Sequence, residues 1–283
     1  MQIGDISVER IMEMVTPFMR PEDMFPDASM ETLNAHRSWM EPAALCPQTG
    51  KIIINIQTYI IRTPQHTILV DTCIGCDKTN HYFAEWHQRS DHIWFDRLLA
   101  HGLDPAEVDY VFCTHLHGDH CGWNTRLIDG RWVPTFPNAR YIISETEIRH
   151  SAAAGAPAYQ ESVLPCIETG QVIAAGNDFA LDDNVWVEPT PGHTPGHIAV
   201  HLKSGKQRAV LCGDVIHSPI QCLYPHWQYW IDYDSGQAND TRRKFLEEQC
   251  EQQRLVLTAH FPGSSMGYVK VQEEAFNFEF VEW

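Results

Sequence analysis

Three histidines and one aspartate stand close together in the stretch FCTHLHGDHCGW, residues 112–123. An apolar run just before them predicts a strand, so these side chains begin where that strand ends. His115 and His117 alternate by two and point to one side of an extended chain, and the glycine after them permits a sharp turn that brings Asp119 and His120 to the same space. Neutral imidazole and carboxylate groups suit zinc, and also manganese, iron or cobalt. The stretch therefore predicts a metal site at a strand end.

Three further segments repeat this order of an apolar run, a ligand-type residue and a turn. TPGHTPGH offers His193 and His197, LCGDV offers Asp214, and LTAHFPG offers His260. Any one of these segments taken alone is more often structural than functional. Together with the first stretch, however, they supply a complete set of imidazole and carboxylate ligands at strand ends.

The composition limits the remaining classes of partner. With 283 residues, 43% of them hydrophobic, the chain can form one large domain or two small ones around a sizeable core. Its net charge of −17 opposes phosphate backbones and anionic membrane surfaces, so we expect no nucleic-acid partner and no membrane association. Nine scattered cysteines and an N-terminus unlike a secretory signal predict a reduced, cytoplasmic protein.

The order of the expected elements indicates an α/β fold. Residues 1–50 are rich in Met and Pro, and we expect an irregular extension with short helices that packs on a catalytic domain at 51–283. Strand patterns outnumber helical ones, which favours sheets packed together and covered outside by helices. Strands are predicted at 51–63, 66–72, 109–113, 139–144, 170–175, 185–190, 197–203, 208–214, 254–260 and 267–272, and helices at 81–103, 144–155 and 240–253. Ser144 and Glu147 have capping-box spacing.

The motifs HxHxDH, GHTPGH, GD and AH, in this order, resemble those of the metallo-β-lactamase superfamily over roughly residues 50–270. The resemblance implies a four-layer αββα sandwich with a metal cleft along one sheet edge. It implies two zinc ions, one held by His115, His117 and His193, the other by Asp119, His120 and His260, with Asp214 bridging them. His197 is then expected to support the site without binding metal, and Asp71 to hold the ligand loop.

Departures from several branches of that superfamily narrow the expected activity. True β-lactamases lack the bridging aspartate, and a redox-active diiron branch has glutamate where this chain has His117. The tRNA-processing branch needs a basic surface, which a net charge of −17 does not provide. The glyoxalase II branch carries a C-terminal helical domain, for which too few residues follow His260. The chain resembles most the lactonase and methyl parathion hydrolase group, but His217 stands where quorum-quenching lactonases have a tyrosine.

Two metal ions close together can share a bridging hydroxide, which attacks a carbonyl or phosphoryl centre at neutral pH. We therefore expect a zinc-dependent hydrolase that opens a lactone or ester, with phosphotriester cleavage as a side activity. Asp119 is expected to orient the hydroxide or to pass a proton to the leaving group. His217 is expected to donate to the developing oxyanion or the leaving oxygen. Two alternatives stay open, a thioester hydrolase of glyoxalase II type and a metal-bound binding module without turnover.

Aromatic residues gather near these motifs and favour a hydrophobic, even aromatic, small-molecule substrate. The stretch 222–234 holds three tyrosines and two tryptophans, and residues 81–95 add more aromatic side chains. No basic cluster stands nearby to hold a carboxylate or phosphate, so a neutral ester, lactone or phosphotriester fits best. The same stretches also fit a homodimer interface. The predicted substrate contacts are Trp123, Trp227, Tyr229, Trp230 and Phe261.

Overall fold

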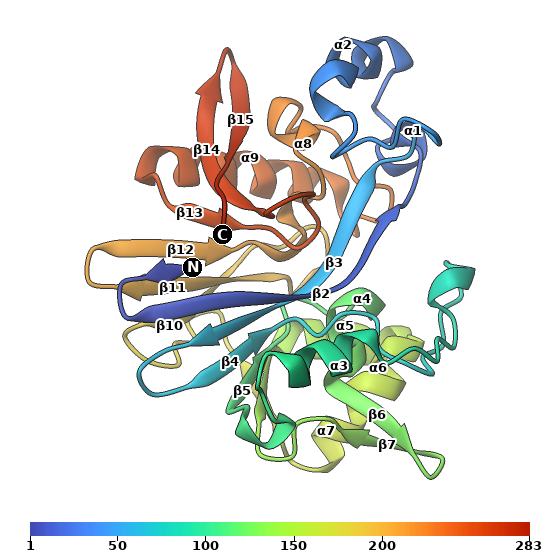
Figure 1. Ribbon diagram of the computed structural model, residues 1–283, viewed down its shortest axis with the longest axis vertical. Coiled ribbons are helices and arrows are strands. Elements are labelled where there is room, and N and C mark those ends of the chain that lie inside the picture. The colour runs from blue at the N-terminus through green and yellow to red at the C-terminus, as the bar shows by residue number, and fades with distance from the viewer.

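Two β-sheets lie face to face in the computed structural model, which describes residues 1–283 (Figure 1). The first sheet has the strand order β1-β2-β3-β4-β5-β8-β9, with bounds Gln2–Ile3, Ile6–Pro17, Ile53–Arg62, Thr67–Val70, Tyr110–Phe112, Arg140–Ser144 and Val172–Ala175. The second sheet runs in sequence order from β10 to β15, with bounds Val185–Pro189, Ile198–Ser204, Gln207–Leu211, Leu255–Leu257, Met266–Gln272 and Ala275–Phe280.

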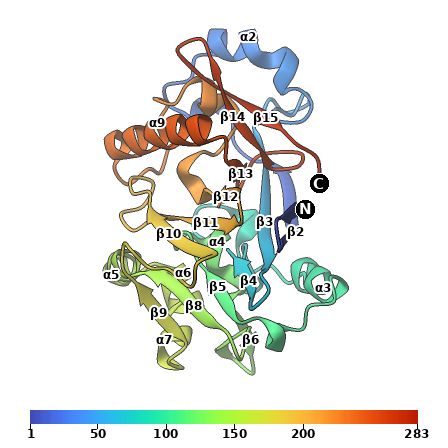
Figure 2. The same ribbon diagram turned by 90° about the vertical axis from the view of Figure 1, so that its left-hand side faces the viewer.

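Helices cover the outer face of each sheet, as the view in Figure 2 allows the reader to follow. On the first sheet lie α3 (Ile93–Ala100), α5 (Glu145–Ala154), α6 (Pro157–Ser162) and α7 (Leu164–Glu168). On the second lies α9 (Ser235–Gln252), whose Phe245 and Leu246 share a core cluster with Val210 and Val256. The layers are therefore helix, sheet, sheet, helix, and the predicted αββα sandwich is confirmed. No helix is both long enough and apolar enough to cross a bilayer.

The side-chain alternation of the strands builds the core between the two sheets. In β12, Ala209 and Leu211 face the first sheet, whereas Val210 faces α9. In β4, Ile68 and Val70 face the second sheet in the same way. Because successive residues of a strand point to opposite faces and both faces are covered here, these strands are apolar on both sides. This explains why they appear in the sequence as short continuous apolar runs.

The N-terminal region differs from the predicted irregular extension. Residues 6–17 form β2, which pairs with β3 from Ser7 to Pro17, with a bulge between Met12 and Met14. Short helices do follow, α1 (Pro21–Met24) and α2 (Met30–Met40). Since β2 is an integral strand of the first sheet, the predicted boundary at residue 50 separates two paired strands and is wrong as a boundary between an extension and a body.

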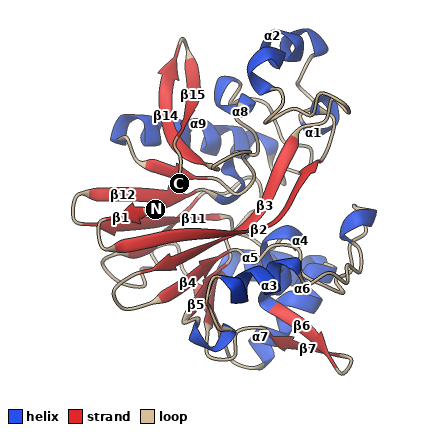
Figure 3. Cartoon of the chain, in the orientation of Figure 1, coloured by secondary structure: helices blue, strands red, loops and turns tan.

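Several further elements differ from the prediction, among them the unexpected helices α6 and α7 (Figure 3). A hairpin of β6 (Thr125–Ile128) and β7 (Arg131–Pro134) was not expected. The edge of the second sheet is β15, which pairs with the predicted strand β14. The expected helical region 81–103 contains only the 3-10 helix η1 (Ala84–Trp86) and α3, with loop between them.

Candidate metal centre

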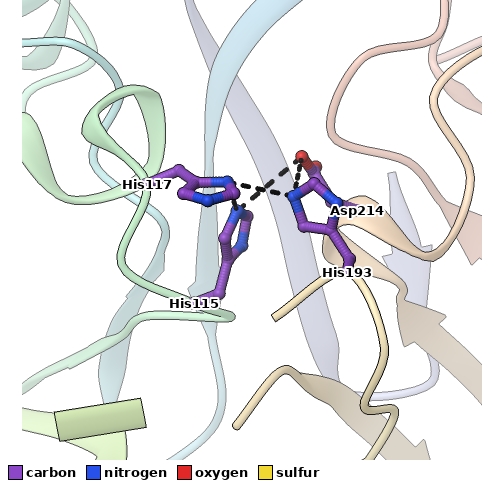
Figure 4. Close-up of side chains that lie close together, drawn as sticks. All are labelled: His115, His117, His193 and Asp214. Atoms are coloured by element: carbon purple, nitrogen blue, oxygen red, sulfur yellow. Dashed lines mark hydrogen bonds and ion pairs between the residues drawn. The ribbon is translucent and has the colours of Figure 1, made fainter. Parts of the chain in front are cut away.

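Segments that follow β4, β5, β10, β12 and β13 converge at one edge of the sandwich. β4 runs parallel to β5 and β12 parallel to β13, so the carboxyl ends of each pair lie side by side. His115 and His117 follow β5, Asp214 lies in the 3-10 helix η4 (Gly213–Val215) after β12, and His260 follows β13. His193 lies in the loop between β10 and β11. Figure 4 shows the side chains of His115, His117, His193 and Asp214 pointing toward one another.

The seven predicted ligands form two adjoining groups, called here the ligand cluster. Ligand atoms lie within 4.8 Å of one another in each group, which are His115, His117, His193 and Asp214, and Asp119, His120 and His260. The carboxylate of Asp214 serves both groups. Its Oδ2 lies 3.3 Å from His193 Nε2, and its Oδ1 lies 3.0 Å from His260 Nε2. Two oxygens divided in this way are suited to bridge two ions.

Hydrogen bonds on the outer side of two rings fix which nitrogen carries the proton. His260 Nδ1 donates to the backbone carbonyl of Asn55 (2.8 Å), and His120 Nδ1 donates to Asp71 Oδ2 (2.9 Å). In the neutral rings both Nε2 atoms then carry lone pairs, yet they face each other at 3.2 Å. Two lone pairs at this distance repel each other unless a cation or a proton lies between them. This donor arrangement therefore fits a bound metal ion.

The first group is arranged in the same way. His193 Nδ1 donates to a buried carboxylate (2.9 Å). His115 Nδ1 donates to Thr114 Oγ1 (3.1 Å), because the Thr114 hydroxyl itself donates to Asp71 Oδ2 (2.9 Å). The Nε2 atoms of His115 and His193 both lie 3.0 Å from His117 Nδ1, which can donate at most one proton. Buried imidazoles with such outer partners are the usual ligands of zinc.

The electrostatics of the ligand cluster favour a positive charge within it. Burial lowers the pKa of His115 and of His117 well below the usual value, so both are neutral at pH 7 and ready to bind metal. Burial also acts to lower the pKa of His120, but the carboxylates of Asp214 and Asp119 outweigh it and raise that pKa well above its usual value. A metal cation therefore competes with a proton at this second group.

Asp71 and His197 support the cluster from behind. The Asp71 carboxylate accepts the backbone N–H of Thr114 (2.8 Å), which confirms the prediction that it holds the ligand loop. His197 Nε2 accepts the backbone N–H of Asp214 (2.9 Å). Gly213 has a φ of +49°, and a Cβ at this position would lie 2.6 Å from His197 Nε2. Only glycine therefore allows this approach just before the bridging aspartate.

The predicted capping box at the start of α5 is wrong. The Ser144 side chain makes no cap hydrogen bond. Glu147 points into the protein instead, where Oε1 accepts the backbone N–H of Leu116 (3.1 Å) and Oε2 accepts that of Gly196 (3.0 Å). One buried carboxylate thereby ties the loop that carries His115 and His117 to the loop that carries His193, through two charge-assisted hydrogen bonds.

A second buried network holds His193 from the other side. The carboxylate that accepts from its Nδ1 is Asp232, whose side chain is fully buried. Arg242 of α9 lies 3.4 Å from Asp232 Oδ2 and donates to the backbone carbonyls of Val215 and Trp227, both at 2.8 Å. The arginine therefore connects α9 to η4, which carries Asp214, and to the aromatic segment before Asp232.

The ligand cluster lies at the base of a cavity of about 370 Å³. Six aromatic side chains, called here the aromatic rim, form one side of it: Phe18, Tyr82, Phe83, Trp86, Tyr229 and Trp230. Small residues between Ala154 and Ala158 form another side. Three carboxylates but no lysine or arginine line this cavity. Its wall is therefore mainly apolar, and it contains no cation to hold an anionic substrate.

Residues 54–269 match the family model described as the metallo-beta-lactamase superfamily. The chain belongs to this superfamily. An N-acyl homoserine lactonase of Bacillus thuringiensis is 28% identical over 181 residues, which make up 60% of this chain and 66% of that protein. The N-acyl homoserine lactonase AttM of Agrobacterium fabrum is 32% identical over 110 residues, 36% of this chain and 38% of that protein. The chain therefore spans less than two thirds of the length of these curated relatives.

Two solved structures show the same metallo-β-lactamase fold over the whole chain. The hydrolase AbOPH of the β-lactamase superfamily has a TM-score of 0.81 and 22% identity, and the match covers 100% of this chain and 97% of that one. AidC, described as a dizinc quorum-quenching lactonase in complex with a product, has a TM-score of 0.80 and 20% identity with the same coverage. At these identities the likeness concerns the fold.

Three aromatic residues predicted to contact substrate lie in the core of this metallo-β-lactamase domain. Trp123 is 1% exposed and stacks on Trp94 with ring centroids 5.3 Å apart. Trp227 is 3% exposed and stacks on Tyr224 at 4.4 Å, and Phe261 is completely buried. None of the three lines the cavity. The prediction is wrong for them because an aromatic residue next to a ligand in sequence can point to the opposite side of the loop.

Tyr229 and Trp230 do line the cavity, whereas His217 lies beneath Tyr229. The rings of Tyr229 and His217 are nearly parallel, at 13°, with centroids 3.6 Å apart. His217 is 1% exposed, and burial lowers its pKa to about 4, so the ring is neutral at pH 7. Because Tyr229 covers it, His217 is not placed to contact a substrate, and the predicted catalytic contact is wrong. Its Nε2 lies 3.2 Å from Asp214 Oδ2 instead.

Sequence reasoning missed the residues that position the ligands from behind. Asp232 and Arg242 have no local motif, and Glu147 was assigned to a helix cap. The only available signal was chemical, since a carboxylate inside the aromatic stretch 222–234 needs a partner once it is buried. The glycine at position 118 also differs from expectation, because its φ is not positive. It lines the cavity, where the lack of a side chain leaves room.

Proposed function

We propose that this chain is a dinuclear metal hydrolase that opens lactones or esters with a neutral, apolar side group. The ligand cluster carries the proposal, because its imidazole lone pairs and carboxylates converge at the base of an apolar cavity. We place lactones first because the Bacillus thuringiensis and Agrobacterium fabrum relatives, matched over part of their length, are N-acyl homoserine lactonases. Zinc as the metal, a cytoplasmic location and a homodimer stay predictions.

Each residue of the ligand cluster has a role in this proposal. His115, His117 and His193 would hold one ion, Asp119, His120 and His260 the other, and Asp214 would bind both. Two bound zinc ions would supply Lewis acidity and a water of lowered pKa. The Asp119 side chain is 14% exposed and lines the cavity, so its carboxylate can accept a proton from the attacking water and return it to the leaving oxygen.

The cavity wall supports a neutral substrate. Asp119, Glu147 and Asp214 are the acidic residues of the lining, and no lysine or arginine balances them. An anionic substrate would therefore depend on the bound ions alone, whereas an apolar side group would bury surface against the aromatic rim. A lactone or ester with an aliphatic or aromatic tail fits this wall, and a phosphotriester, which is also uncharged, fits as a side substrate.

The test combines metal content with turnover on one sample of purified protein. We expect about two metal ions per chain and hydrolysis of N-acyl homoserine lactones and aryl esters, with weaker activity on a phosphotriester and on a glutathione thioester. An exposed variant on α9, Asp240→Asn, should behave like the wild type. Two ions with the thioester as the best substrate would support the thioesterase alternative. Two ions without turnover on any of these compounds would overturn the proposed substrate class and favour a binding module.

A further inference from the structure

The hydroxyl group of Tyr229 is accessible at the cavity and makes no hydrogen bond to the protein. The residue is 7% exposed and lines the cavity above the ligand cluster. Its backbone N–H donates to Asp232 Oδ2 (2.9 Å), and its backbone carbonyl accepts the N–H of Asp232 (2.9 Å). The phenolic oxygen makes no hydrogen bond. A hydroxyl that no protein group pairs and that a ligand in the cavity can reach is available as a donor to that ligand.

The position of this hydroxyl is fixed by groups that also hold the ligand cluster. Asp232 accepts from the Tyr229 backbone through Oδ2 and from the ligand-type residue His193 through Oδ1, both at 2.9 Å. The Tyr229 ring is stacked on His217 at 3.6 Å. Tyr229 and His193 therefore share one buried carboxylate as their support, and the hydroxyl keeps a set position above the cluster without a bond of its own.

A second unpaired donor lies beside the first. The indole N–H of Trp230 is buried without a partner and lies close to the Tyr229 hydroxyl, though not in hydrogen-bond geometry. Both side chains line the same cavity. A phenolic oxygen beside the Trp230 indole N–H can accept from it and still donate its own O–H, for which the protein offers no acceptor. An acceptor oxygen that arrives with a ligand can take that O–H.

We propose that Tyr229 donates a hydrogen bond to the carbonyl oxygen of the substrate, with the Trp230 indole N–H supporting the phenolic oxygen. The inference rests on the proposed function, since it assigns a catalytic residue to the same reaction. The carbonyl oxygen gains negative charge as water adds to the carbon, so a donor fixed beforehand stabilises the transition state more than the ground state.

Tyr229 keeps its proton throughout this reaction. A tyrosine hydroxyl ordinarily loses its proton only near pH 10, well above neutral pH. The hydroxyl therefore acts as a donor and not as an acid. Proton transfer between the attacking water and the leaving oxygen stays with Asp119, and the products are the carboxylic acid and the alcohol, which remain one molecule when a lactone opens.

The variant Tyr229→Phe tests this role because it keeps the ring that stacks on His217 and removes only the hydroxyl. We expect kcat to fall about 100-fold with KM changed by less than about twofold, as for the loss of one preorganised donor. Metal content and thermal stability should match the wild type. The matched control is Tyr224→Phe in the same aromatic segment, whose hydroxyl pairs with His36 Nε2 (2.7 Å) and should not affect turnover.

Substrates with different leaving groups locate the donor. A bond to the carbonyl oxygen predicts the same fall in kcat for a poor leaving group, as in a lactone, and for p-nitrophenol. A fall confined to the lactone would place the donor at the leaving oxygen and overturn this assignment. An unchanged kcat, or a rise in KM alone, would overturn the donor role. Trp230→Phe should reduce kcat less than Tyr229→Phe does.

A binding measurement separates this inference from the proposed function. N-hexanoyl-L-homoserine is an open-chain hydroxy acid whose carboxylate retains the former carbonyl oxygen. In calorimetry we expect Tyr229→Phe to bind it about tenfold more weakly than the wild type, because a hydrogen bond to a charged acceptor is lost. A wild type without turnover would reject the proposed function, yet this comparison would still decide on Tyr229. Equal affinity of the two proteins would overturn the inference.

Discussion

The ligand cluster and the aromatic rim surround the same cavity but are held in opposite ways. Each of His115, His120, His193 and His260 has a partner on its outer nitrogen, so the cluster rings are fixed by hydrogen bonds. The rim is held mainly by ring contacts, such as Phe83 against Trp86 at 4.5 Å and against Trp230 at 6.2 Å. Tyr82 is 79% exposed.

This difference matches what each region has to do. A metal site requires ligand positions within a few tenths of an ångström, and outer hydrogen bonds provide them. A wall that accepts apolar groups needs surface more than direction, and ring contacts between loops allow small adjustments. We therefore expect changes in the cluster to act on metal binding and kcat, and loss of a whole rim ring to act on KM. The polar groups of Tyr229 and Trp230 are the exception, because their proposed role is in kcat.

The largest effect is expected for Asp214→Ala. It removes the only carboxylate that faces both groups, and it leaves His193 and His260 without their common partner. Activity should fall by more than the 10- to 100-fold that is usual for the loss of an outer partner, and both ions should be lost. Metal analysis and kcat measure this. Full activity would contradict the proposal that the cluster binds two ions through one shared carboxylate.

A smaller effect on the same region is expected for Glu147→Gln. The amide replaces one acceptor oxygen with a donor that faces the backbone N–H of Leu116 or Gly196. Metal should then leave about tenfold faster when a chelator is added, while KM stays the same. The control is Glu145→Gln, a change at an exposed position two residues earlier on α5. Equal rates of metal release from the two variants would show that the loops that carry His117 and His193 are held in place without Glu147.

Glu13 of β2 is a buried carboxylate that should make the stability of the fold depend on pH. Its carboxylate accepts the Ile74 backbone N–H (2.7 Å) and the Trp123 indole N–H (2.8 Å), and burial raises its pKa to about 7 despite Arg89. The folded chain therefore binds a proton that the unfolded chain releases above pH 4.5, so this contribution to stability is complete below pH 4.5 and is lost as the pH rises through 7.

Between pH 5 and pH 8, the free energy of unfolding should fall by about 2.5 kcal/mol more in the wild type than in Glu13→Gln. Urea unfolding at the two pH values measures the difference. Glu9→Gln, a change at a partly exposed position of the same strand, is the control and should follow the wild type. The same pH dependence in wild type and Glu13→Gln would show that Glu13 is not the group that titrates.

The smallest effect is expected for Trp230→Ala in the aromatic rim. Loss of its ring should raise KM for aryl esters about fivefold and leave metal content unchanged, since an aromatic contact contributes about 1 kcal/mol. Steady-state kinetics on an aryl ester and on an aliphatic ester measure this. Trp39→Ala, on the surface of α2, is the control. Loss of metal in Trp230→Ala would show that the aromatic rim also contributes to metal binding.

The cluster could be predicted from the sequence because its signal is local. Asp214 and His260 each follow a short apolar run and precede a turn, and strand ends in a sandwich meet at an edge. The rim could be predicted only in part. Tyr229 and Trp230 were predicted correctly, but Trp123 was predicted with them because it looks like Trp230 in the sequence. Only the packing shows that Trp123 stacks on Trp94 in the core while Trp230 faces the cavity.

The same distinction explains the error in the N-terminal region. Ile6 and Val8 of β2 alternate, and so do Ile11 and Glu13, but the pattern shifts by one residue between Val8 and Ile11. This shift hides the period of two that is typical of a strand. The supporting carboxylates of Glu147 and Asp232 were missed for a different reason. Their partners are far away in the sequence, so no pattern along the chain reveals them.

The pairing of β2 with β3 also has a consequence for handling the protein. A fragment that starts at residue 51, where the composition suggests a boundary, would lack β2 and expose the backbone N–H and C=O groups of β3 along one edge. Most residues of β3 are apolar, and all except the two at its ends are buried in the intact chain. An uncovered strand of this kind pairs readily with its own copies. We therefore expect such a fragment to aggregate when expressed, even though it retains every metal ligand.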